Sequence, residues 1–209
     1  MTTSFANTEA ITEVEVPEVF IAEYLDGIPM YYKGYKKIIN NPSQIEEIMG
    51  GGGIHSLFLM HFGFLLNKIL DDNKYCIIGG ETGLRAEKKN LFSLNVAVYY
   101  RESLSAQPLE YEFQKLSPVI VVEVDTSVEN DAVTEDEYIF KKTQRLIDFG
   151  TQRVVWFFSR TKKIMMAQPD TAWQIHNWDV DIELIDGVRF NLYNYCVENR
   201  LLNMIKLSW

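Results

Sequence analysis

Two spacings of apolar residues along the chain predict its main elements. Between residues 54 and 71 one face repeats every three or four positions, which is the pattern of an amphipathic helix; it comprises Ile54, Leu57, Phe58, His61, Phe62, Leu65, Leu66 and Ile69. A second helix is predicted over residues 135–149, because acidic residues at its start complement the helix dipole and Gly150 is a stop signal.

Shorter runs rich in β-branched and aromatic residues predict strands. Residues 18–32 hold two such runs around Asp26-Gly27, a dipeptide that favours a tight hairpin. A short helix is expected over residues 44–49, before the glycines at 50–53, and another from Leu192. Further strands are expected at Tyr75–Gly79, Gly83–Ala86, Leu94–Tyr100, Arg153–Phe158, Lys163–Ala167 and Ala172–Trp178. Strands interspersed with two long helices predict an α/β (α+β) fold with a mixed sheet.

The most informative strand is the run PVIVVEVD at residues 118–125, which contains Glu123. A continuous apolar run of this kind is typical of a central strand covered on both faces. An isolated carboxylate there costs several kcal/mol, roughly, so Glu123 needs a compensating partner. Because side chains alternate along a strand, we expect Asp125 to share the face of Glu123.

Polar residues on two other elements are candidate partners. Tyr138, Lys142 and Leu146 are spaced by four on the second long helix, so Lys142 lies in an apolar stripe. Its stem could lie along the core with the ammonium in water, or the ammonium could reach a buried anion. On the strand 94–100, Asn95 is expected to share a face with Ala97 and Tyr99, opposite Leu94, Val96, Val98 and Tyr100. A buried amide must be hydrogen-bonded.

Composition narrows the class of protein. The 209 residues, 47% of them hydrophobic, suffice for one core, and we expect a polar N-terminal arm at residues 1–16 followed by one domain at 17–209. The arm lacks the features of a secretory signal and no apolar run is long enough for a membrane span, so a cytoplasmic protein without membrane contact is expected. Cys76 and Cys196 are too far apart for a metal knuckle and are expected to be ordinary thiols.

The net charge of −9 argues against a broad basic surface for nucleic acid. It leaves open a local basic groove, for which the compact basic groups are Lys33, Lys36 and Lys37, and Arg160, Lys162 and Lys163. The glycines at 50–53 lack the Lys-Ser/Thr of a phosphate-binding loop of the Walker type.

The order Asn95, Glu123 with Asp125, then Lys142 resembles a known arrangement. The chain is similar to the Uma-two type of restriction endonuclease, a bacterial family in the PD-(D/E)XK nuclease superfamily, over about residues 18–195. The likeness rests on EYLDG, on Ile54-His55-Ser56, on the position of Lys142 before Gly150, and on the segments LNVAVYY, SPVIVVEV and RVVWFFSRTKKIMMA. It implies a restriction-endonuclease-like mixed central sheet flanked by helices, with an N-terminal hairpin.

The resemblance also implies a chemistry, namely hydrolysis of DNA phosphodiester bonds with Mg²⁺ (or Mn²⁺). Glu123 matches the metal-binding glutamate, and Lys142 the lysine that orients or activates the attacking water. Asn95 stands at the usual aspartate position and Leu94 at that of a proline. Losing a ligand charge weakens metal binding, which Asp125 could partly compensate as a third ligand. Glu23 and His55 are additional site candidates, although an exposed hairpin glutamate and a capping or surface histidine explain them equally simply.

Two functional classes therefore remain. One is a metal-dependent endonuclease weakened by Asn95. The other is a nuclease-fold protein that has lost efficient catalysis and binds nucleic acid or a protein partner. A purely structural ion pair between Glu123 and Lys142 also explains those two residues. A homodimer is expected, because cutting both strands of a duplex commonly uses two sites related by a two-fold axis.

Overall fold

A mixed β-sheet forms the centre of the computed structural model, which describes residues 16–109 and 111–204. Within those residues the strands run in the order β6-β2-β1-β4-β5-β7-β8-β9, with β3 also paired to β4. The strands β5 and β7 are parallel, and the other pairs are antiparallel. The strands are β1 (Ile21–Leu25), β2 (Ile28–Tyr32), β3 (Tyr75–Glu87), β4 (Asn90–Tyr100), β5 (Ile120–Val124), β6 (Val128–Glu129), β7 (Arg153–Phe158), β8 (Lys163–Ala167) and β9 (Gln174–Asn177).

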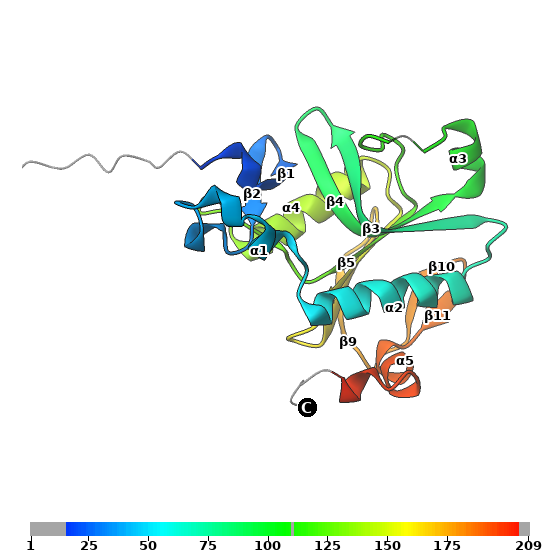
Figure 1. Cartoon of the computed structure of the whole chain (residues 1–209). Coiled ribbons are helices and arrows are strands. Elements are labelled where there is room, and N and C mark those ends of the chain that lie inside the picture. Colours follow the sequence, from blue (N-terminus) through cyan, green and yellow to red (C-terminus); the bar gives the residue numbers. More distant parts are fainter. Residues whose placement is uncertain (1–15, 110, 205–209) are drawn as a thin grey trace, which may run out of the picture.

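Two long helices cover opposite faces of this sheet. The helix α2 (Gly53–Ile69) packs Phe58 and Phe62 in one core cluster with Ile120, Val122 and Val124 of β5. The helix α4 (Glu135–Asp148) lies behind the sheet in the view of Figure 1, whereas α2 lies in front of it. It packs in a second cluster with Val121 of the same strand. The remaining helices are short: α1 (Glu46–Met49), α3 (Arg101–Ala106), α5 (Leu192–Glu198), and the 3₁₀ turns η1 (Glu18–Phe20), η2 (Tyr35–Lys37), η3 (Pro42–Gln44) and η4 (Leu201–Asn203).

The expected fold class is confirmed: a mixed α+β architecture with helices on the sheet and an N-terminal hairpin. The hairpin turn has Asp26 at φ 54° and Gly27 at φ 82°, the left-handed geometry expected of this dipeptide. The two expected strands at Tyr75–Gly79 and Gly83–Ala86 are one long strand, β3, whose register shifts between Gly79 and Thr82.

The face predicted for Leu94 on β4 is wrong. Leu94 does not pack with Val96 and Val98, which lie in the α2 cluster, but with Ala97 and Tyr99 in the α4 cluster. The alternation of side chains is interrupted around Asn95, where the paired strand β3 has its register shift. An irregularity of this kind re-aims side chains, and it occurs at a predicted site residue.

Several elements escaped prediction, among them the short strand β6. The segment after β4 contains α3, and a separate hairpin is formed by β10 (Ile182–Ile185) and β11 (Val188–Phe190). The polar arm expected at residues 1–16 lies outside the described residues except for Val16. In the part of the chain that is described, no single helix combines the length and apolar composition of a membrane span, although the bent pair Pro42–Met49 and Gly53–Ile69 does so jointly.

Candidate functional site

Three buried charged side chains meet between β1, β5 and α4. Lys142 Nζ lies 2.9 Å from Glu23 Oε1 and 3.1 Å from Glu123 Oε1. Only 1% of Lys142 and 3% of each glutamate is exposed. Lys142 therefore reaches a buried anion instead of placing its ammonium in water, and Glu23 is a buried member of the cluster rather than an exposed hairpin residue.

Glu23 is held by a full set of donors. Its carboxylate accepts hydrogen bonds from Tyr138 Oη at 2.7 Å, from the backbone N–H of Ser93 at 2.8 Å and from Lys142. Lys142 also donates to the backbone oxygen of Ser93 at 3.1 Å. Sequence reasoning missed Ser93 and gave Tyr138 no polar role, although its spacing of four residues from Lys142 already placed both on one helix face.

Glu123 is less well satisfied. Among described residues no donor makes a hydrogen bond of regular geometry to its Oε1, despite the nearby ammonium. Burial raises the pKa of Glu123 to about 7; the charge of Lys142 lowers it and that of Glu23 raises it. For Lys142, burial lowers the pKa, but the two carboxylates outweigh burial and the net pKa is raised.

The start of α4 explains how Lys142 is aimed at the sheet. Thr134 and Glu137 form a reciprocal capping box, which fixes the first turn of the helix. Two turns later, aromatic rings surround the ammonium, with Nζ 5.6–5.8 Å from the ring centroids of Phe92, Tyr138 and Trp156. The negative faces of these rings add to the stabilisation of the buried cation.

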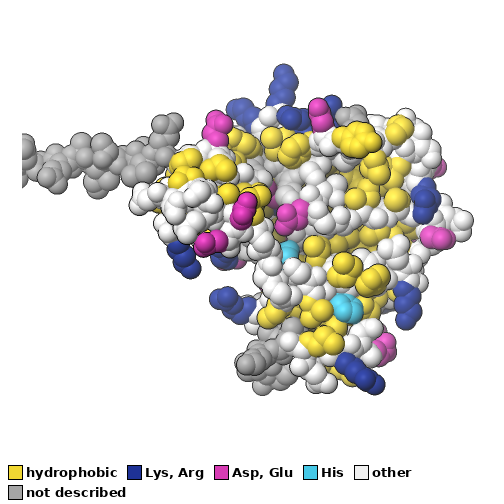
Figure 2. Space-filling view, viewed as in Figure 1, with side chains coloured by type: hydrophobic (Ala, Val, Ile, Leu, Met, Phe, Trp, Pro, Cys, Tyr) yellow, Lys and Arg dark blue, Asp and Glu magenta, His cyan; other side chains and the backbone are white. Residues whose placement is uncertain are grey.

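A pocket of about 320 Å³ opens beside this cluster. Its wall includes Glu23, Ser93 and Asn95 from the sheet, Asp125 after β5, and the segment that leads into α2; Glu123 lies outside the lining. Figure 2 shows acidic side chains and a histidine near the middle of this face of the molecule, with basic side chains nearer its edges.

Asn95 is buried, with 5% of its surface exposed, and its orientation is fixed. Its Oδ1 accepts a hydrogen bond from the backbone N–H of Val124 at 2.8 Å. A backbone N–H can only donate, so the oxygen of the amide must point to β5 and the Nδ2 atom must point away from it. The Asn95 oxygen that was expected to ligate a metal is therefore hydrogen-bonded to the backbone of Val124.

Asp125 does not stack above Glu123 as expected. The strand β5 ends at Val124, and Asp125 has φ 50°, so the alternation of the strand stops before it. Its carboxylate accepts hydrogen bonds from the backbone N–H and the hydroxyl of Ser159 at 2.8 and 2.5 Å. Asp125 lines the pocket but is bound to the end of β7, which sequence reasoning did not foresee.

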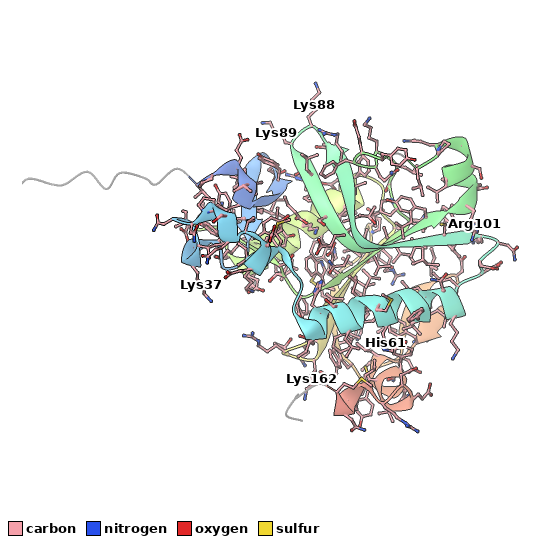
Figure 3. The ribbon with its side chains drawn as sticks, in the orientation of Figure 1. Lys37, His61, Lys88, Lys89, Arg101 and Lys162 are labelled. Carbon is pink, nitrogen blue, oxygen red and sulfur yellow. The ribbon has the colours of Figure 1, made fainter. Side chains whose placement is uncertain are left out.

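The histidines separate into different environments. His55 lines the pocket near the start of α2, and its role there stays a prediction. Figure 3 shows His61 on the side of α2 toward α5, where its Nδ1 lies 2.9 Å from Tyr195 Oη. His61 therefore belongs to helix packing.

The arrangement does not fit a preformed divalent-metal site. Magnesium needs oxygen ligands, usually one or two carboxylates with water and substrate phosphate. Here Glu23 is saturated by donors, Asp125 is bound to Ser159, and Asn95 directs its oxygen to Val124. Within residues 16–109 and 111–204, no group of three His, Cys, Asp or Glu side chains is placed to hold a metal ion.

Comparison with known proteins supports the fold. No protein-family model and no curated protein matches the chain. Among solved structures, a protein of Anabaena variabilis ATCC 29413, described as a putative nuclease belonging to DUF820, is similar with a TM-score of 0.60 and 11% identity, covering 83% of this chain and 88% of that one. At this level of identity the likeness concerns the fold alone, which is restriction-endonuclease-like.

Proposed function

We propose that the chain is a nuclease-fold protein that binds nucleic acid through its pocket and has lost efficient metal-dependent hydrolysis. The observation behind the loss is the orientation of Asn95, whose oxygen is committed to Val124. The buried cluster is then structural, since Lys142 is the counter-charge that Glu23 and Glu123 share.

The class of ligand is supported by the similarity of fold to the DUF820 protein and by the hydrogen-bond donors around the pocket. The acidic overall charge of −9 favours a local contact over a broad electrostatic surface. We therefore expect weak binding that depends on salt concentration.

A second candidate is a competent Mg²⁺- or Mn²⁺-dependent endonuclease that hydrolyses DNA. One observation favours it: Glu123 Oε1 is a buried acceptor with no regular donor among described residues, and such an atom is costly to retain without a role. In that case Glu123 would hold the ion, which would supply an activated water and neutralise charge on the phosphate.

Nicking of supercoiled plasmid DNA with Mn²⁺ separates the two candidates. We expect the wild type to nick no faster than Glu123→Gln, while binding a labelled oligonucleotide in EDTA. Metal-dependent nicking by the wild type that disappears in a folded Glu123→Gln protein would establish the second candidate and reject the first. The homodimer remains a prediction, measurable by sedimentation.

A further inference from the structure

We propose that the pocket binds a phosphodiester group directly, without a metal ion, through the amide nitrogen of Asn95 and the N-terminal end of α2. The inference rests on the proposed function for the choice of nucleic acid. Beyond that function, it names the protein atoms that contact the phosphate and the charge of the phosphate group that binds.

The first contact follows from the orientation of Asn95. Its oxygen is bound to Val124, so the Nδ2 group is the part of the amide left to face the pocket that Asn95 lines. Only 5% of Asn95 is exposed, and Nδ2 makes no hydrogen bond to any residue in the described ranges. Nδ2 is not one of the fully buried atoms that lack a partner, so it is open to the pocket. A donor that is open to the pocket and has no protein acceptor is free to bind an acceptor oxygen of a ligand. An aspartate at the same position would present an acceptor and attract a cation instead.

The second contact is the start of α2, a helix of 17 residues. Its N-cap is Gly52, which offers no side-chain cap, and its first turn has no acidic residue. The first backbone hydrogen bond of the helix runs from Ser56 N to Gly52 O at 3.0 Å. The N–H groups of the preceding three residues, 53–55, have no acceptor within the described chain. Such a terminus has a partial positive charge and favours anions.

These two features meet at one pocket. Gly50, Gly51, Gly52 and His55 line it from the helix side, and Asn95 lines it from the sheet. A Cβ atom added at Gly50 or Gly52 would meet nothing within 4 Å, so the approach to the N–H groups is open. The volume of about 320 Å³ suits a phosphate group with part of its neighbouring sugars.

The charges around the pocket select the type of phosphate. Glu23, Glu81 and Asp125 all line it, so a doubly charged phosphate monoester meets repulsion from three carboxylates. Lys33 also lines the pocket, but its ammonium is paired with Glu135 at 3.6 Å. The oxygens of Glu23 and Asp125 are turned to their own donors, which reduces this repulsion. A phosphodiester has a single negative charge. We therefore expect the internal phosphate of a strand to bind in preference to a terminal monoester.

The dinucleotide thymidylyl-thymidine is a suitable probe, because it has one phosphodiester and no monoester. Its binding is measured by isothermal titration at low salt in EDTA, and inorganic phosphate at pH 8 is the dianionic comparison. We expect saturable binding of the dinucleotide to the wild type and weaker binding of inorganic phosphate. Asn95→Asp should reduce the affinity for the dinucleotide by about tenfold or more, because a donor becomes a negatively charged acceptor.

A second variant tests the helix contact without risk to folding. Gly52→Asp places a capping carboxylate over the N–H groups at an N-cap with ordinary backbone angles, φ −59° and ψ 154°. We expect an unchanged or higher melting temperature with at least about tenfold weaker dinucleotide binding. Gly63→Asp is the matched control: it adds the same charge about 16 Å farther along α2, also in open space, and should bind as the wild type does.

The outcomes separate this inference from the proposed function. Dinucleotide binding in EDTA that is lost in both Asn95→Asp and Gly52→Asp supports the inference, even if the plasmid assay reveals metal-dependent nicking. Three results overturn it, whatever the plasmid assay shows. They are absence of binding to the folded wild type, binding that requires Mn²⁺, and binding by both variants with the same affinity as the wild type.

Discussion

Asn95 on β4 and Val124 on β5 are joined side chain to backbone: Asn95 Oδ1 accepts the N–H of Val124 at 2.8 Å. The bond lies where the register of β3 shifts against β4 and at the last residue of β5. It decides which end of the amide faces the pocket. The position that the resemblance assigned to a metal ligand thereby becomes a hydrogen-bond donor.

Asn95→Asp should create metal affinity. One carboxylate oxygen can still accept the N–H of Val124, while the other adds an anionic ligand facing the pocket. We expect Mn²⁺ to raise the melting temperature of this variant and not that of the wild type, and EDTA to reverse the effect. Asn90→Asp is the control, since Asn90 is equally buried and its oxygen binds Asp26 N away from the pocket. A metal response in the control would show that the effect is not local.

Lys142→Met should destabilise the fold severely. The variant leaves Glu23 and Glu123 buried without their shared cation, and breaking a buried pair in this way typically costs about 3–5 kcal/mol. Urea unfolding at pH 8 measures the loss. The adjacent exposed residue provides a control, because Lys141→Met should change the unfolding free energy by less than about 0.5 kcal/mol. Equal stability of the two variants would mean that the cluster contributes little.

The raised pKa of Glu123 predicts a pH dependence of stability. Its pKa is about 7 in the folded protein against an ordinary value of 4.5, so between these values the folded state keeps a proton that the unfolded state releases. The contribution to stability is complete below about 4.5 and declines as the pH rises toward about 7. We expect the unfolding free energy of the wild type, relative to that of Glu123→Gln, to fall across this window. A constant difference between the two proteins would contradict the assigned shift.

Tyr138→Phe tests the other end of the cluster. The hydroxyl of Tyr138 donates to Glu23 Oε2 at 2.7 Å in a buried setting, and a hydrogen bond to a charged group is typically worth about 1.5–3 kcal/mol. Denaturant unfolding should show a loss in this range. Tyr31→Phe removes a hydroxyl from a partly exposed ring on β2 and should cost much less. If Tyr138→Phe were as stable as that control, the hydroxyl would not be needed by Glu23.

The sequence pattern predicted the elements that carry the cluster. The apolar run around Glu123 placed that residue on a buried strand, and the spacing of four from Tyr138 placed Lys142 on the apolar face of its helix. The dipeptide Asp26-Gly27 located the first hairpin. The same dipeptide at Asp186-Gly187 turns the β10–β11 hairpin with φ 53° and 77°, so that signal was present and overlooked. These signals are local, and local periodicity is what a single sequence shows best.

The contacts that define the pocket depended on distant segments. Glu23 meets Lys142 across 119 positions, and Asp125 meets Ser159 across 34, which no periodicity links. The turn at Asp125 also needed a left-handed backbone that aspartate tolerates but does not require. The orientation of the Asn95 amide follows from a single backbone N–H and could be read only from the folded chain.

Isothermal titration of the wild type with Mn²⁺ in the absence of nucleic acid, beside Glu123→Gln, tests most directly whether the pocket has ceased to be a metal site. With Asn95, Asp125 and Glu23 committed to protein donors, we expect no saturable binding in the wild type and the same trace from the variant. Binding of one ion to the wild type that disappears in a folded Glu123→Gln protein would contradict this and restore the metal-dependent nuclease as the function of the pocket.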